Sequence, residues 1–141
     1  MLKIFGLLIA MGFCPSIYAA NTTLTDAEIA KMMQEEHKKN AAETKTLAKD
    51  NEIKPVDSEM SKQLVKENKE NAKALKSKDK KSFDKSYAQM MVAGHEKVLK
   101  TLDETLIPAA KDPEFKGHLE KTRGAVATHL SHAKDLDSKI Q

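Results

Sequence analysis

Three histidines set among apolar residues are the side chains of this sequence that could do chemistry. His37, His95 and His129 each lie in a different long segment that has an apolar residue every three or four positions. The segment SFDKSYAQMMVAGHEKVL, residues 82–99, shows this pattern around His95. Imidazole nitrogens bind zinc and copper. If the three segments are helices of one bundle and the histidines lie at one height, they could hold such an ion.

Two interpretations of these histidines stay open, because height within a bundle cannot be read from sequence. In one, the three imidazoles converge on a metal, with His132 or Glu36 as a further ligand. In the other, each ring lies in the core or at its boundary and bonds to a carbonyl, a hydroxyl or a facing acid. The second case is the more common one in helical proteins. We therefore assign no metal site and no cofactor, and we keep His37, His95 and His129 as candidate metal ligands.

Two pairs of adjacent methionines carry the same alternatives. Thioether sulfur is a soft ligand that suits copper, but methionine in a helix more often fills gaps in the core. We favour packing for all four, which are Met32, Met33, Met90 and Met91.

Motifs that would carry catalysis are absent from the sequence. A carboxylate-bridged di-iron bundle needs Glu and His three residues apart, and no histidine here follows a glutamate at that spacing. HEKVL, residues 95–99, begins like a zinc-protease motif but has Leu99 where the second histidine must stand. Neither a Gly-x-Ser-x-Gly motif nor a glycine-rich phosphate loop is found. We predict that the protein is not an enzyme.

The chain opens with MLKIFGLLIAMGFCPSIYAA, which has the layout of a secretory signal peptide. Lys3 precedes an apolar run, and small residues follow at Ala19 and Ala20. We predict that residues 1–19 are the signal peptide, with cleavage after Ala20 as the alternative. The mature chain is then periplasmic or secreted.

The same leader bears on anchoring and on disulfides. A lipid anchor on Cys14 is disfavoured because the bulky Phe13 precedes it, and cleavage removes this one cysteine. No later segment approaches the roughly 20 apolar residues that a transmembrane helix needs. The expected mature protein has no transmembrane segment and is held together by packing alone.

Composition predicts an all-α protein that does not bind nucleic acid. Aromatic residues make up 4% of the chain, whereas Ala, Leu, Met, Lys and Glu, which favour helix, are abundant. The formal net charge is +3, with acidic and basic residues interspersed. Arg123 is the single arginine, so the usual contacts to phosphate and bases are missing.

The apolar spacing predicts one domain over residues 24–141, an up-and-down four-helix bundle. We expect caps at Thr25, at Asp57 or Ser58, at Ser82 and at Asp112, and an end to the third helix at Pro108. The predicted helices span about 25–50, 58–76, 83–106 and 113–140.

Three local features of the predicted bundle bear on its stability and its contacts. Asn68 and Asn71 interrupt the apolar side of the second helix, so we expect it to be the least stable. The basic stretch KALKSKDKKS, residues 73–82, is read as a solvated connection, with contact to anionic lipid or polysaccharide as the alternative. Gly94 lies inside a helix, where a close helix contact would explain it.

Several motifs resemble those of one exported bacterial family. They are FDKSYAQMMVAGHEKVL, then Asp112-Pro113 and His129-Leu130 with Ala133, preceded by KMMQEEHKKNAAETKTLAKDNEIKP. Together they look like the domain-of-unknown-function family numbered forty-one forty-two, which often carries an outer-membrane label. The resemblance covers most of the mature chain. It implies a ferritin-like fold and an exported location, and it implies no reaction.

The chain departs from this family near its start. Only LTDAEIA, residues 24–30, precedes KMM, so the first helix looks shortened. A shortened bundle would leave an apolar seam uncovered, which motivates a homodimer hypothesis that light scattering can test. We predict an exported, non-catalytic helical bundle with a binding or structural role in the envelope; the alternative is a zinc- or copper-binding envelope protein using the three histidines.

Overall fold

The computed structural model describes residues 24–54 and 56–140. The predicted signal peptide and its cleavage site lie outside this part. Four long helices, joined by short connections, form the described chain, and no strand occurs within it. They are α2 (Leu24–Asp50), α3 (Glu59–Lys76), α4 (Lys80–Thr101) and α6 (Pro113–Lys139). The all-α fold class is confirmed.

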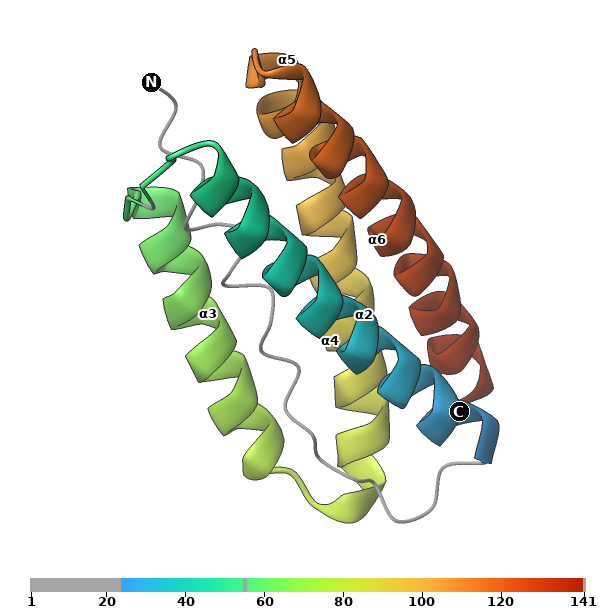
Figure 1. The fold of residues 1–141 in the computed structure, drawn as a ribbon. Helices are drawn as coiled ribbons and strands as arrows, with labels where there is room; N and C mark the ends of the chain where they lie inside the picture. The colour runs from blue at the N-terminus through green and yellow to red at the C-terminus, as the bar shows by residue number, and fades with distance from the viewer. Residues whose placement is uncertain (1–23, 55, 141) are drawn as a thin grey trace.

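The helices run alternately up and down, so α2 and α4 point the same way while α3 and α6 point the opposite way (Figure 1). The most extensive packing is between α4 and α6, and α2 packs on α6. Each helix contributes one inward side because apolar positions recur every three or four residues. The arrangement is the predicted four-helix bundle.

Two helix starts agree with the sequence prediction. Ser58 caps α3 through a capping box, in which its hydroxyl accepts from the Ser61 backbone N–H and the Ser61 hydroxyl accepts from the Ser58 N–H. Asp112 caps α6 by accepting from the Phe115 N–H at 2.7 Å, and Pro113 occupies the first helical position. These caps satisfy N–H groups that would otherwise lack partners.

Two other starts differ from the prediction. Asp79, not Ser82, caps α4, because its carboxylate accepts from the Ser82 N–H at 2.8 Å and lysine propagates helix well. The basic connection therefore shrinks from the predicted 73–82 to residues 77–79. Thr25 lies inside α2, which includes Leu24, and is not its cap.

Pro108 does not end the third helix where we expected. The chain continues from α4 through a π-helical turn, η1 (Leu102–Leu106), into a short α5 (Ile107–Ala109). In η1 the Ile107 N–H donates to the Leu102 carbonyl, five residues earlier. Proline has no N–H for the carbonyl four residues back and its ring crowds it. A widened turn accommodates Pro108 without breaking the helix.

The apolar core lies where η1 meets the first half of α6. Its buried residues are Leu102, Leu106, Leu119 and Val126. By contrast α3 packs on α4 and buries only Ser61 and Leu75 among its own residues. Four large apolar side chains on or next to α3 are exposed, namely Ile53, Val56, Met60 and Val65. The interrupted apolar side predicted for the second helix therefore buries few residues.

Gly94 has no close helix contact. A Cβ built on this residue would meet nothing within 4 Å, and the same is true at Gly117 and Gly124. The explanation offered for Gly94 from sequence is therefore wrong. Among the described residues, no helix is both long and apolar enough to cross a membrane.

Candidate metal centre

His37, His95 and His129 meet inside the bundle, one from each of α2, α4 and α6. Their ring centroids lie 4.9 Å apart for His37 and His129, 5.6 Å for His95 and His129, and 5.9 Å for His37 and His95. One ligand nitrogen from each lies within 4.8 Å of those of the other two. Zinc binds imidazole nitrogen at about 2.0–2.1 Å, so the rings would draw closer around an ion. The convergence that sequence left open is thus present.

The three rings differ in depth. His129 is 1% exposed and His95 is 8% exposed, whereas His37 is half-buried. The cluster is therefore closed on the α4 and α6 sides and shallower at α2.

Each of the two buried rings bonds through one nitrogen and leaves the other unpartnered. His95 Nδ1 lies 2.7 Å from the Met91 carbonyl oxygen, which can only accept, so this nitrogen carries the proton. The Nε2 atom of His95 is buried and has no hydrogen-bond partner among the described residues. A neutral imidazole protonated at Nδ1 has its lone pair at Nε2. The fold thus fixes His95 in a form that can ligate a metal.

In His129 it is Nε2, not Nδ1, that has the partner. Its Nε2 lies 2.7 Å from Oε2 of Glu36, and its Nδ1 is buried without a hydrogen-bond partner among the described residues. Metal-ligating histidines commonly donate their other N–H to a carboxylate or a carbonyl. His95 and His129 have these two kinds of partner.

Burial disfavours protonation of two rings of the cluster, those of His37 and His95. Desolvation, and then the nearby His129 and His95, lower the pKa of His37 to about 4. Desolvation also lowers the pKa of His95. Protons therefore compete weakly with a metal ion for these two rings at pH 7.

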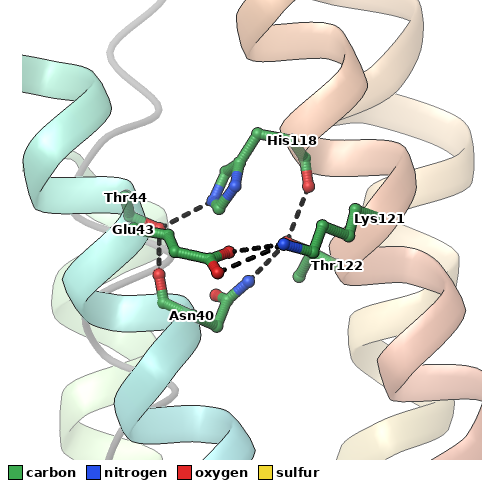
Figure 2. A network of polar contacts seen from close by, with 6 residues as sticks. All are labelled: Asn40, Glu43, Thr44, His118, Lys121 and Thr122. Carbon is green, nitrogen blue, oxygen red and sulfur yellow. Dashed lines mark hydrogen bonds and ion pairs between the residues drawn. The ribbon is translucent and has the colours of Figure 1, made fainter. Parts of the chain in front are cut away.

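A network of polar contacts joins α2 and α6 (Figure 2). Thr44 donates to the Asn40 carbonyl at 2.8 Å and accepts from His118 Nε2 at 2.8 Å. Thr122 donates to the His118 carbonyl at 2.8 Å and accepts from Asn40 Nδ2 at 2.7 Å. We call these four residues the α2–α6 network. The network starts one turn from His37, so it fixes the part of α2 that carries this ligand.

Ion pairs also join these helices on the outside of the bundle. Lys121 bonds both carboxylate oxygens of Glu43 across α2 and α6 at 3.0 and 3.1 Å (Figure 2). Lys134 pairs with Glu96 at 2.9 Å across α4 and α6. Because these side chains are largely solvated, each pair adds little stability. The buried network and the apolar core fix the helices more firmly.

The other candidate ligands predicted from the sequence are the four methionines, Glu36 and His132. Met33 is buried in the core and Met32, Met90 and Met91 are half-buried, in line with a packing role. Among the two additional ligand candidates, Glu36 contacts the cluster through His129. His132 is half-buried, and its buried Nδ1 has no partner among the described residues.

Sequence reasoning missed His118. The signal was available: Asn40 precedes Thr44 by four residues and His118 precedes Thr122 by four, so each helix offers a side-chain donor and a hydroxyl on one face. His118 stands apart from the three-histidine cluster and serves the α2–α6 network.

With this geometry in place, comparison with protein families identifies the class of the chain. The family model "Domain of unknown function (DUF4142)" matches residues 26–136, and the chain belongs to this family. The resemblance inferred from the histidine and methionine motifs is confirmed. Neither the curated proteins nor the solved structures compared with the chain include a match.

Proposed function

We propose that this protein binds a transition-metal ion, zinc or copper, through His37, His95 and His129, and does so as an exported protein of the cell envelope. The metal-binding alternative is thereby preferred to simple packing of the histidines. The leader sequence supports export, and N-terminal sequencing of the processed chain should find Ala20 as its first residue.

One observation carries the proposal: two buried imidazoles keep an unpartnered nitrogen beside a third histidine. Leaving a buried polar atom without a partner costs about 1–3 kcal/mol. His95 Nε2 and His129 Nδ1 are both of this kind, and their rings are 5.6 Å apart between centroids. Apolar side chains at these two positions would carry no such penalty. A bound ion would remove it at both atoms.

The donor set also limits the ion. Three imidazole nitrogens suit zinc and copper, whereas calcium and magnesium require oxygen ligands. Among the described residues, the cluster of three candidate ligands contains no carboxylate or thiolate.

A thermal melt of the mature chain without a polyhistidine tag tests the proposal. Zinc or copper at 100 times its dissociation constant should stabilise the fold by about 2.7 kcal/mol and raise the midpoint by roughly 5 to 10 °C. His95→Gln should abolish this shift. Glu120→Gln is the control, because Glu120 is exposed on α6 and belongs neither to the cluster nor to the α2–α6 network. A wild-type midpoint that does not move with either metal would reject the function.

A further inference from the structure

Glu36 and His129 make a contact between α2 and α6 that occupies one of the two ring nitrogens of His129. Glu36 Oε2 lies 2.7 Å from His129 Nε2, and the His129 ring is 1% exposed while the Glu36 side chain is 45% exposed. The carboxylate reaches from the surface of α2 to a ring buried on α6. The second nitrogen, Nδ1, is left buried without a partner among the described residues.

In the hydrogen bond between these two side chains, His129 is the donor and Glu36 is the acceptor. An ionised carboxylate accepts hydrogen bonds and cannot donate them, so the proton of a neutral His129 must lie on Nε2. The lone pair is then on Nδ1. A free neutral histidine would distribute its proton between the two nitrogens, and only one of the two forms presents Nδ1 as a ligand atom.

We infer that Glu36 is a positioning residue that holds His129 as the Nε2–H tautomer and so makes Nδ1 its metal-ligating atom. This inference rests on the proposed metal-binding function. Glu36 does not replace a ligand; it orients one, as carboxylates beside metal-bound histidines do in other proteins. The Met91 carbonyl does the same for His95, but a backbone group cannot be removed by mutation, which makes Glu36 the informative residue.

Imidazole nitrogen NMR of the tag-free mature chain, with ¹⁵N-labelled histidine, reads this assignment directly. In the metal-free protein, His129 should carry its proton on Nε2. Addition of zinc should shift the His129 Nδ1 resonance and leave Nε2 protonated. Glu36→Ala should mix the two tautomers of His129 and weaken zinc binding by 10- to 100-fold, by analogy with other orienting partners.

Two further variants separate orientation from charge. Glu36→Gln keeps an amide oxygen that accepts from Nε2–H, so it should retain zinc affinity to within a few-fold and keep the tautomer. Glu35→Ala removes a neighbouring exposed carboxylate of equal charge and should change neither property. Since Glu36 is half exposed on a helix, its removal should leave the fold intact, and circular dichroism checks this.

The outcomes of these experiments test the role of Glu36 separately from the proposed metal binding. If the wild-type chain binds zinc and Glu36→Ala binds it equally well, the role of Glu36 is wrong and the metal function stands. If zinc shifts Nε2 of His129, Glu36 is displaced by the ion and the inference is also wrong. If the wild-type chain binds no metal, both fail together.

Discussion

Thr44 and Thr122 play the same part on opposite sides of the α2–α6 contact. Each hydroxyl donates to the carbonyl four residues earlier in its own helix and accepts from the side chain of the equivalent residue in the other helix. Each threonine is almost fully buried. The two helices are thereby held in one register, and this register brings His37 to the level of His129.

Loss of either hydroxyl should destabilise the bundle. Thr44→Val keeps the volume but leaves His118 Nε2–H facing a methyl group, so we expect the free energy of unfolding to fall by about 1–3 kcal/mol. Urea unfolding measures it. Thr128→Val, at an exposed position of α6 where the hydroxyl bonds only within its helix, should stay within about 0.5 kcal/mol of wild type. Equal effects at both positions would contradict the role of the network.

Gly94→Ala should stabilise the protein. A Cβ at this position meets nothing within 4 Å, and alanine is favoured over glycine in a helix interior by about 1 kcal/mol. A rise of the urea midpoint without a change in slope would verify the effect. A destabilised variant would show that a helix contact does occupy this space.

Stability of the metal-free protein should fall as the pH drops from about 6.5 toward 4. The pKa of His37 is lowered to about 4 by desolvation and by the other two histidines. Above the ordinary value of about 6.5 the ring is neutral in both folded and unfolded chains, and nothing changes. Below it the unfolded chain takes up the proton first, which favours unfolding. His95, whose pKa is also lowered by burial, acts in the same direction.

Urea unfolding at pH 7.5 and pH 5 checks this pH dependence. His37→Gln should flatten the difference. His118→Gln should flatten it less, because burial lowers the His118 pKa without the added repulsion from two neighbouring histidines. A wild-type free energy of unfolding that is constant between these pH values would contradict the lowered pKa values of His37 and His95.

Amide hydrogen exchange should find α3 the least protected of the four long helices. This helix packs on α4 and buries only Ser61 and Leu75, and its pair between Glu67 and Lys97 is partly solvated. Helices with few buried apolar contacts open at low free energy. Protection in α3 equal to that in α6 would contradict this order of stability.

The fold class could be predicted from the sequence because helix formation depends on local patterns of residues. Apolar spacing gave four helices, and Ser58 and Asp112 marked two of their starts. Errors arose where two local rules competed. The lysines before Ser82 read as a solvated loop, yet Asp79 caps them into α4. Pro108 read as a helix end, yet a π-helical turn accommodates it.

The residues of the candidate site could be predicted from the sequence, but the distances between them could not. Spacing placed His37, His95 and His129 near the inner faces of their helices, but their separation depends on how far each helix slides along its neighbours. That offset is set by contacts between distant residues, such as Asn40 with Thr122. Which nitrogen each ring exposes depends likewise on Glu36, whose partner lies on another helix.

The uneven depth of the three rings has a consequence for any ion bound there. His95 and His129 are covered while His37 is half-buried, and three protein ligands leave a fourth position of a tetrahedral ion for water. Such an ion would be nearest to solvent on the α2 side, where His37 is half-buried. A chelator should then extract it from the native protein, at a rate that does not wait for the helices to come apart.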